Sequence, residues 1–408
     1  SPSRETRAAR LDAMIAAVEA NEARIVRTIA EDFGTRAAAE TLSAEVIMSI
    51  AAARMAKKHL GKWMRPRKAP TPLYLKPARS QVIPQPLGVV GVIAPWNYPV
   101  QLALTPAIAA LAAGNRVMIK PSALTPRTRE LLKEMLSAAF EESVLAVVTG
   151  GVETGAAFTR VPFDHLLFTG STAIGRKVAE EAAKNLTPVT LELGGKSPAI
   201  VDASADLARA ARSIAHGKTY NAGQTCVAPD YVLAPRDRLD ATVEAIAAAA
   251  RDLYPEIDTT PDYTSIVSDR HFARLASMVE EARAAGAKIV EVGSQNALHP
   301  RRKLPLTLIV EPPATTRVMQ EEIFGPVLPV LPVDSADDAI DRVNAGERPL
   351  ALYWFGDDRA TQDKVLERTV SGGVTINDTL MHVAQENLPF GGVGKSGMGA
   401  YHGEAGFV

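Results

Sequence analysis

The chain has 408 residues, 47% of them hydrophobic and 22% charged, which fits a globular protein of two or three domains. The formal net charge of −1, with no long block of either sign, argues against nucleic acid and against a membrane surface as partners. A single cysteine excludes an internal disulfide and fits the reducing cytoplasm, where we expect the protein to reside.

Helical periodicity dominates residues 4–59, where apolar side chains such as Leu11 and Ile15 recur three and four positions apart. Gly34 is expected to divide this region into two helices. The start of the chain lacks the apolar core of a signal peptide, and no apolar run approaches the roughly 20 residues of a membrane span. Residues 67–87 are rich in proline. Because proline is disfavoured in central strands, we expect an extended arm with edge strands there.

Short apolar runs alternate with helical stretches from residue 88 onward, which is typical of strands buried on both faces of a parallel sheet. Two such series occur, one before and one after Pro198, so we predict two doubly wound α/β domains. Helices in the first series are expected at 101–113, 126–140 and 171–185. Strands are expected at 88–95, 115–121, 144–150, 164–170 and 189–195, and then at 198–202, 231–235, 265–268, 288–293, 306–311, 327–333, 351–356 and 373–377.

Cys226 lies in the sequence YNAGQTCVAP, after a long helical stretch. A lone cysteine is commonly a small buried apolar residue. Here Gly223, Gln224 and Thr225 precede it, which indicates a tight turn and not the packed interior of an element. A thiol becomes a good nucleophile when its thiolate is accessible or a base lies near. From the local sequence alone, both roles stay open for Cys226.

Two polar residues at strand ends are further candidates. Glu192 ends an apolar run and precedes two glycines. It is either a strand-end residue facing water or a general base at the carboxyl edge of a sheet, where α/β proteins build their sites. Asn97 lies in PWNYP, whose prolines fix the backbone around its amide. That amide suits either an ordinary turn or an oxyanion hole.

Other positions suit a nucleotide. The stretch GSTAIG at 170–175 follows an apolar run and opens a helix, which is typical of a phosphate site, although it is neither a dinucleotide fingerprint nor a P-loop. Lys120 is either a ribose-binding or phosphate-binding cation or an exposed lysine. Glu322 and Phe324 suit a ribose carboxylate beside a packing ring, or a loop before the next strand. The seven histidines show no metal-ligand spacing, so we expect no metal.

Taken together, these segments resemble the aldehyde dehydrogenase family over essentially the whole chain. NAGQTCVAPDYVL and LPFGGVGKSGMGAYHG resemble its class 3-type branch, and PQPLGVVGVIAPWNYP and NDTLMHVAQENLPFGG are most similar to coniferyl aldehyde dehydrogenases. The matching motifs, in the family's order and spacing, are PWNYP (95–99), KPS (120–122), FTGSTAIG (168–175), LELGGKSP (191–198), GQTC (223–226), EEIFGP (321–326) and PFGG (389–392).

The resemblance implies oxidation of an aldehyde to a carboxylic acid by Cys226 as nucleophile. Asn97 and the Cys226 backbone amide would steady the oxyanion, and Glu192 would activate the water that hydrolyses the thioester. The class 3-type branch and its coniferyl members imply an aromatic, coniferaldehyde-like substrate. Oxidation of medium or long aliphatic aldehydes, acyl transfer to coenzyme A and a non-catalytic scaffold are the alternatives, and the presence of Glu192 argues against acyl transfer to coenzyme A.

The same resemblance implies a nicotinamide cofactor. Lys120 would hold the adenosine ribose, residues 170–175 the pyrophosphate and Glu322 the nicotinamide ribose. Many NAD-preferring members have a glutamate where this chain has Ala123, and that carboxylate would repel a 2′-phosphate. NAD is therefore expected, with NADP possible. The residues expected to contact the cofactor are Ile93, Pro95, Trp96, Lys120, Ser122, Gly151, Phe168, Gly170, Ser171, Ile174, Gly175, Leu193, Gly194, Glu322 and Phe324.

The family's architecture implies a division into a cofactor-binding domain at 1–66 and 88–193 and a catalytic domain at 194–392. Residues 67–87 and 393–408 would form an oligomerisation arm in a homodimer or higher homo-oligomer. The sequence stops without an obvious helix cap, so we expect the chain to continue past Val408. Whether the residues beyond complete the arm or add a membrane anchor stays open.

Overall fold

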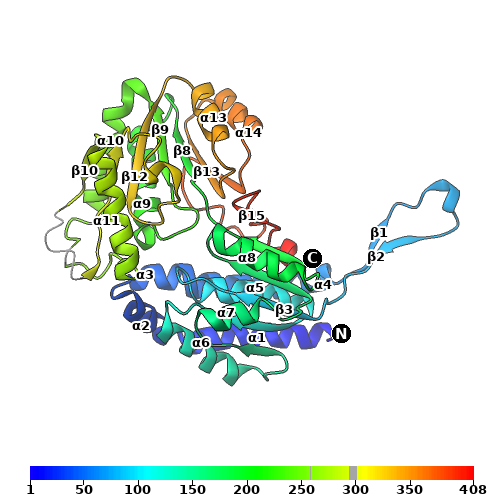
Figure 1. Ribbon diagram of the computed structural model, residues 1–408. Coiled ribbons are helices and arrows are strands. Elements are labelled where there is room, and N and C mark those ends of the chain that lie inside the picture. Colours follow the sequence, from blue (N-terminus) through cyan, green and yellow to red (C-terminus); the bar gives the residue numbers. More distant parts are fainter. Residues whose placement is uncertain (258, 294–300) are drawn as a thin grey trace.

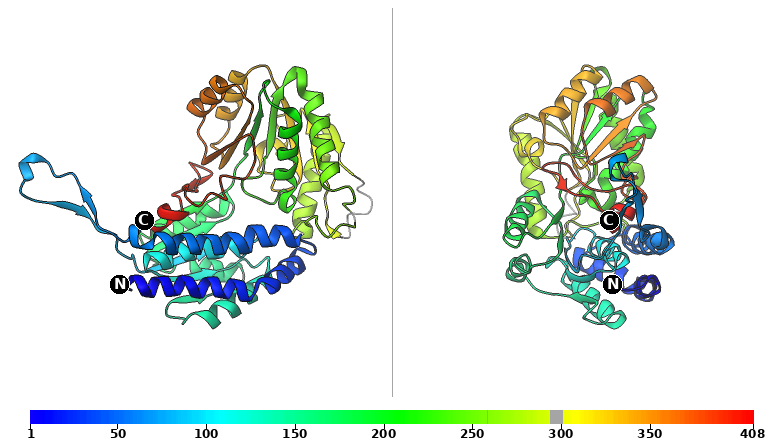
Figure 2. Two further views of the ribbon diagram at one scale, coloured as in Figure 1. Left: turned by 180° about the vertical axis from the view of Figure 1, so that it is seen from behind. Right: turned by 90° about the vertical axis from the view of Figure 1, so that its right-hand side faces the viewer.

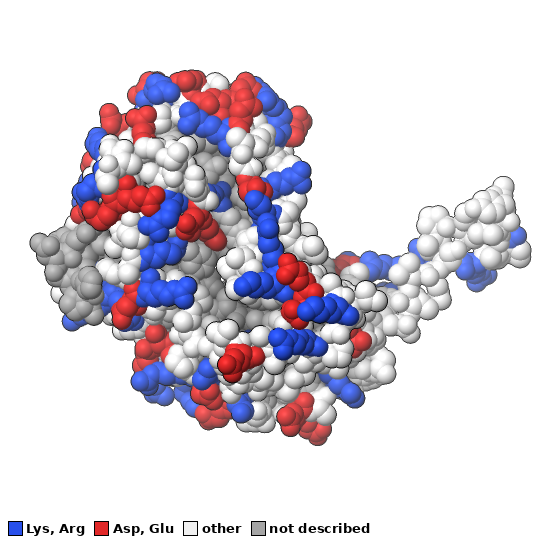
Figure 3. Space-filling model, in the orientation of Figure 1, with Lys and Arg blue, Asp and Glu red and all other residues white. Residues whose placement is uncertain are grey.

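The computed structural model describes residues 1–257, 259–293 and 301–408. The protein folds into two lobes, each built around one sheet, and a hairpin arm extends away from them (Figure 1). In the view of Figure 3, charges of both signs are interspersed over the surface, and a hollow separates the two lobes. In the described part of the chain, no helix is long and apolar enough to cross a membrane.

The first lobe contains a sheet whose described strands follow the order β15–β7–β6–β3–β4–β5. All neighbours are parallel except β15, which runs antiparallel to β7. Val90 and Val92 of β3 pack into one helix-covered core, and Val89 and Ile93 pack into the opposite one. Helices therefore cover both faces, as predicted. The strands are β3 (Val89–Ile93), β4 (Arg116–Lys120), β5 (Leu145–Val147), β6 (His165–Thr169), β7 (Val189–Glu192) and β15 (Gly397–Met398).

The second lobe contains a sheet in the order β10–β11–β12–β9–β8–β13–β14. Here β10 is antiparallel to β11, and the other neighbours are parallel. Helices α9 and α10 cover one face, and α13 and α14 cover the other. The strands are β8 (Pro198–Val201), β9 (Tyr231–Pro235), β10 (Lys288–Glu291), β11 (Thr307–Val310), β12 (Val327–Val333), β13 (Ala351–Phe355) and β14 (Gly373–Ile376).

The N-terminal helices break twice, not once as predicted. Helix α1 ends at Ala20, because the side chain of Asn21 folds back and its Nδ2 donates to Ala17 O at 2.9 Å. Helix α2 ends before Gly34, whose φ is 93°. The first-lobe helices are α1 (Arg4–Ala20), α2 (Glu22–Phe33), α3 (Ala38–Thr41), the π-helix η1 (Leu42–Ile47), α4 (Met48–Trp63), α5 (Gln101–Ala113), α6 (Pro126–Ala139), α7 (Val152–Phe158) and α8 (Thr172–Ala183).

The strand predicted at 265–268 is wrong. The backbone amide of Ser265 donates to Thr35 O and that of Ile266 to Arg302 O, both at 2.9 Å, so these groups are satisfied outside a ladder. The second-lobe helices are α9 (Leu207–Thr219), η3 (Tyr220–Gly223), η4 (Arg236–Arg238), α10 (Leu239–Leu253), α11 (Asp269–Ala284), α12 (Arg317–Gln320), α13 (Ala336–Ala345) and α14 (Arg359–Arg368).

The proline-rich segment is an isolated hairpin. Strand β1 (Arg67–Ala69) pairs antiparallel with β2 (Ser80–Val82), and the short helix η2 (Leu73–Leu75) lies at the tip. Figure 2 shows this arm extending away from both lobes. The last residues instead lie against the first lobe, where α15 (Gly403–Phe407) packs on α4 and α5. A role for residues 393–408 in an oligomer stays a prediction.

Candidate active site

The turn before Cys226 is held in an unusual backbone conformation. Asn221, Ala222 and Gly223 have φ values of 52°, 51° and 69°, a left-handed region that costs non-glycine residues roughly 1–3 kcal/mol each. A Cβ on Gly223 would lie 2.5 Å from Gly325 O, so only glycine fits there. The tight turn predicted before Cys226 is confirmed, and the strain is concentrated directly before the thiol.

Gln224 fixes this turn from within. Its Nε2 donates to Asn221 O at 3.0 Å and to Ser265 O at 3.1 Å, and its Oε1 accepts from Val267 N at 2.9 Å. The side chain is fully buried, so these bonds are not exchanged with water. Residues 265–268, which the sequence predicts as a strand, therefore hold the turn before Cys226 through the side chain of Gln224.

Asn97 ties the loop after β3 to the same turn. Its Nδ2 donates to Gln224 O at 3.1 Å. Its backbone carbonyl accepts from Arg36 Nη1 at 2.8 Å and from Asn221 Nδ2 at 3.1 Å. The Asn97 amide is therefore buried and held in one orientation beside Cys226. An ordinary turn would not need these additional hydrogen bonds.

A buried ion pair supports this loop. Arg36 Nη1 lies 3.3 Å from Glu45 Oε1, and both side chains are inaccessible to solvent. Glu45 Oε2 accepts from the backbone amides of Val100 and Gln101 at 2.8 and 2.9 Å, at the N-terminus of α5. The carboxylate satisfies amides that a helix start leaves free.

Glu192 is the last residue of β7 and is only 2% exposed. Neither carboxylate oxygen has a hydrogen-bond partner in the described residues, so the water-facing alternative is excluded. Burial raises the pKa of Glu192 well above its ordinary value. A carboxyl group with a raised pKa is better suited to act as a general base near neutral pH.

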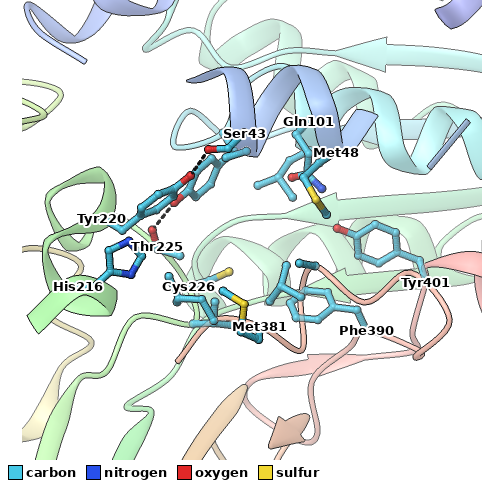
Figure 4. Close-up of a pocket in the computed structure, with 17 residues that line it drawn as sticks. Ser43, Met48, Gln101, His216, Tyr220, Thr225, Cys226, Met381, Phe390 and Tyr401 are labelled. Atoms are coloured by element: carbon cyan, nitrogen blue, oxygen red, sulfur yellow. Dashed lines mark hydrogen bonds between the residues drawn. The ribbon is translucent and has the colours of Figure 1, made fainter. Parts of the chain in front are cut away.

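Two cavities meet at Cys226. One, of about 360 Å³, is mainly apolar; we call it the apolar cavity (Figure 4). The other, of about 500 Å³, is the glycine-lined cavity and also contains Glu192 and Asn97. Cys226 lines both. The apolar cavity is lined by Ser43, Ala44, Met48, Tyr98, Gln101, Leu102, His216, Tyr220, Thr225, Cys226, Val227, Leu380, Met381, Val383, Ala384, Phe390 and Tyr401.

Two carboxyl groups lie near the thiol of Cys226. Burial and the nearby carboxylates of Glu322 and Glu192 raise the pKa of the Cys226 thiol above its ordinary value. Since a thiolate and not a thiol is the nucleophile, this environment keeps the cysteine of the free protein in its less reactive form at neutral pH.

Glu322 is held over the turn after β7. A Cβ on Gly194 would lie 2.0 Å from Glu322 Oε2, so the turn must be glycine there. Burial, and then the charge of Asp230, raise the pKa of Glu322 to about 8. Phe324 has a φ of 52°, and its ring meets Trp96 edge-on with centroids 5.3 Å apart.

A cluster of charged side chains fixes the loop that carries Glu322. Lys196 binds Asp230 and donates to Val318 O at 2.6 Å. Asp230 Oδ1 accepts from Ile323 N at 3.0 Å, and Arg274 donates to Glu322 O at 3.4 Å. The loop is therefore anchored on both sides of its acidic residue.

The glycine-lined cavity fits a nicotinamide nucleotide. Gly170 follows β6, and Ser171 is the N-cap of α8, whose amide-bearing N-terminus suits a phosphate group. A Cβ on Gly175 would lie 2.6 Å from Leu193, which explains the close approach of α8 to the sheet. A volume of about 500 Å³ lies in the range of small-molecule sites.

Part of the predicted cofactor set lines this cavity, namely Pro95, Trp96, Gly170, Ser171, Leu193, Gly194, Glu322 and Phe324. The rest lies outside its lining, namely Ile93, Lys120, Ser122, Gly151, Phe168, Ile174 and Gly175. Lys120, at the end of β4, is only 7% exposed, so its interpretation as an exposed lysine is wrong. The roles of all these residues towards a cofactor stay predictions.

Sequence reasoning missed several lining residues. Thr169 and Thr172 lie within the motif FTGSTAIG (168–175), whereas His271 and Arg274 lie on α11 without any motif. In the apolar cavity, Ser43 and Met48 come from the N-terminal helices, which are far from Cys226 in sequence. Their helical pattern gives no sign of a site.

Comparison with known proteins agrees with this geometry. The family model described as the aldehyde dehydrogenase family matches residues 2–408. The chain belongs to this family. A probable coniferyl aldehyde dehydrogenase of Caulobacter vibrioides is 51% identical, with 100% of this chain and 85% of that protein covered.

Solved structures of aldehyde dehydrogenases have a fold similar to that of this chain. The substrate-bound state of Staphylococcus aureus AldH has a TM-score of 0.94 at 39% identity, covering 99% of this chain and 87% of that one. A Mycobacterium tuberculosis aldehyde dehydrogenase complexed with NAD+ has a TM-score of 0.89 at 31% identity, covering 100% and 83%. The expected α/β aldehyde dehydrogenase fold is confirmed.

Proposed function

We propose that this aldehyde dehydrogenase oxidises an aromatic, coniferaldehyde-like aldehyde to its carboxylic acid with NAD. The observation that carries the proposal is the position of Cys226, the residue that lines both the apolar and the glycine-lined cavity. An aldehyde in the first cavity and a nicotinamide in the second would meet at the thiol. The 51% identity to a probable coniferyl aldehyde dehydrogenase supports an aromatic substrate.

The proposed reaction begins when Cys226 Sγ bonds to the aldehyde carbon. The thiol proton passes to solvent water, and the carbonyl oxygen becomes an oxyanion that the Asn97 amide and the Cys226 backbone amide would stabilise. The chemistry that a bound nicotinamide would supply here is acceptance of a hydride from this carbon. Cys226 then carries a thioester. Glu192 takes a proton from water, whose oxygen bonds to the acyl carbon as the carbon–sulfur bond breaks.

Binding of NAD is proposed at the glycine-lined cavity. The α8 N-terminus would face the pyrophosphate, Glu322 the nicotinamide ribose, and Lys120 the adenosine ribose. Ala123 is exposed and carries no charge that would repel a 2′-phosphate, so we propose that NADP is accepted as well. Initial rates with each cofactor, at one aldehyde concentration, test this preference.

We also propose that the arm at 67–87 joins a homodimer and that the protein works in the cytoplasm. The arm exposes large apolar side chains, with Leu73 82% and Tyr74 84% exposed, and monomeric proteins rarely leave such patches uncovered. The chain has one cysteine and cannot form an internal disulfide, which fits a reducing compartment.

The test is an absorbance assay for reduced nicotinamide with coniferaldehyde, cinnamaldehyde and hexanal. We expect the aromatic aldehydes to be oxidised with higher kcat/KM than hexanal. Cys226→Ala should abolish the signal while NAD still binds by calorimetry. An alanine variant that keeps its rate would contradict the proposal, as would acyl-coenzyme A as the main product.

A further inference from the structure

One side of the apolar cavity is polar. Ser43, His216 and Tyr220 lie together there, whereas Tyr401 lies on the other side (Figure 4). Most of the remaining lining is apolar, including Met48, Leu102, Val383 and Phe390. A polar group in an otherwise apolar cavity fixes the orientation of a ligand.

Three separate elements bring this polar side together. Ser43 lies on η1, a π-helix of the kind often found at functional sites. His216 lies in the last turn of α9, and Tyr220 begins η3. The rings of His216 and Tyr220 are 5.5 Å apart between centroids. Helix η3 also contains the left-handed turn at residues 221–223, just before Cys226. Tyr220 and the nucleophile are therefore positioned by the same segment.

The hydrogen bonds give Tyr220 a defined role. Ser43 has one hydroxyl proton and donates it to Ala39 O at 2.7 Å. Tyr220 Oη can then direct its own proton to Ser43 Oγ at 2.8 Å or to Glu40 O at 3.4 Å. Its single proton is used inside the protein. The remaining lone pair of Tyr220 Oη can only accept, so it suits a ligand hydroxyl and not an ether oxygen.

His216 complements this acceptor. Burial lowers the pKa of His216, so at neutral pH the ring is uncharged and carries one donor and one acceptor nitrogen. No hydrogen bond of this ring to another described residue is seen. A ligand hydroxyl group can donate its proton to Tyr220 Oη and accept a hydrogen bond from the His216 ring. Its donor and its acceptor would then both be satisfied.

Two methionine side chains form part of the walls of the apolar cavity. Met48 begins α4 and Met381 follows β14, and Figure 4 shows them on opposite sides of the cavity. The polarisable sulfur of methionine interacts favourably with aromatic rings, by about 0.3–1.5 kcal/mol. These side chains therefore favour an aromatic ring within the apolar cavity.

We propose that Tyr220 and His216 select aldehydes whose aromatic ring carries a hydroxyl group at the end remote from the aldehyde. The ring would lie in the apolar cavity, with its hydroxyl donating to Tyr220 Oη. This inference rests on the proposed oxidation of aromatic aldehydes and adds the recognised group and the residues that recognise it.

The experiment compares 4-hydroxycinnamaldehyde with 4-methoxycinnamaldehyde, which differ in the ability to donate a hydrogen bond. In the wild type, kcat/KM should favour the hydroxyl compound by about three- to tenfold, the effect of one neutral hydrogen bond. In Tyr220→Phe this ratio should fall towards one. The variant keeps the ring that packs on His216, and its melting temperature checks the fold. Tyr74→Phe, in the exposed arm, is the matched control and should keep the wild-type ratio.

The outcomes separate this inference from the proposed function. Equal ratios in the wild type, Tyr220→Phe and a second variant, His216→Phe, would overturn the selection of a hydroxyl group while leaving aldehyde oxidation intact. A ratio that falls in Tyr74→Phe as well would also overturn it. Absence of reduced nicotinamide with these aldehydes and with hexanal would contradict the proposed function and this inference together.

Discussion

At the scale of single residues, the central question is how Cys226 becomes reactive. Its thiol pKa is raised by burial and by Glu322 and Glu192. Glu192 is itself buried without a hydrogen-bond partner in the described residues. We infer that Glu192 serves the hydrolytic step and is a hindrance to thiolate formation in the free protein. The two steps of the reaction therefore place opposite demands on one carboxyl group.

The charge on Glu192 should be visible in the alkylation of Cys226. Because a negative neighbour raises an acid's pKa, Glu192→Gln should shift the pH profile of iodoacetamide labelling to lower pH, by roughly 0.5–1 pH unit. Labelling is unambiguous, since the chain has one cysteine. The exposed-site variant Glu142→Gln should leave the profile unchanged. A shift to higher pH in Glu192→Gln would mean that Glu192 is the base for the thiol.

The sequence points to Glu192, Asn97 and Cys226 as candidate site residues, but it does not reveal their burial or their hydrogen-bond partners. Glu192, Asn97 and Cys226 were each ambiguous from their own segments, and only the combined motifs favoured catalytic positions. The structure adds what no local pattern contains: Glu192 is buried without a partner among the described residues, and Arg36 reaches Asn97 from across 61 positions. Long-range hydrogen bonds leave no periodic signal.

At the scale of elements, the loop after β3 depends on a charge pair in the N-terminal helices. Arg36 and Glu45 are both buried, and Glu45 also holds the start of α5. Removing one partner of such a pair leaves the other charge buried without compensation, which typically costs about 3–5 kcal/mol. The pair thus contributes to positioning of Asn97 more than a surface ion pair does.

Arg36→Met should therefore lower the free energy of unfolding by about 3–5 kcal/mol, measured by urea denaturation. The matched control is Arg24→Met, which breaks the exposed pair with Glu134 at 2.6 Å and should cost at most about 1 kcal/mol. Equal costs for the two variants would show that the buried pair has no special role.

Regular elements were predicted well where their periodicity was strong. The helix at Gln101–Ala113 was predicted with its observed bounds, because Gly114 stops it. The strand expected at 265–268 is absent, since its amides bind loops and the Gln224 side chain. Gly223, Gln224 and Thr225 predict the tight turn before Cys226, but nothing in the sequence indicates the left-handed conformation of Asn221 and Ala222. A π-helix such as η1 has no pattern that distinguishes it from the α-helices beside it.

At the scale of the whole molecule, the site lies where the two lobes face each other. The first lobe contributes Asn97 and Glu192, and the second contributes Cys226 and Glu322. The first sheet places Asn97 and Glu192 at the carboxyl ends of β3 and β7, where α/β folds bind ligands. In the second lobe, Cys226 and Glu322 lie in the loops that precede β9 and β12. The alternation of strands and helices predicted both sheets. The contacts across the lobes were not predictable, because they join residues from distant segments.

The arm should control assembly. Replacing the exposed Leu73 and Tyr74 with glutamate should convert a dimer to a monomer in sedimentation experiments, because burying the two charges in an interface would cost several kcal/mol. Leu186→Glu, at an exposed leucine of the first lobe, is the control and should keep the dimer. A double variant that still sediments as a dimer would contradict the proposed role of the arm.

The measurement that tests the central claim most directly is mass spectrometry of the acylated protein. Glu192→Gln, with coniferaldehyde and NAD, should accumulate a thioester because hydrolysis lacks its base. The peptide that contains Cys226 should gain the mass of the aldehyde less two hydrogen atoms, and hydroxylamine should release the acyl group. If the acid forms at the wild-type rate and Cys226 stays unmodified, covalent catalysis by Cys226 with Glu192 as the base is wrong.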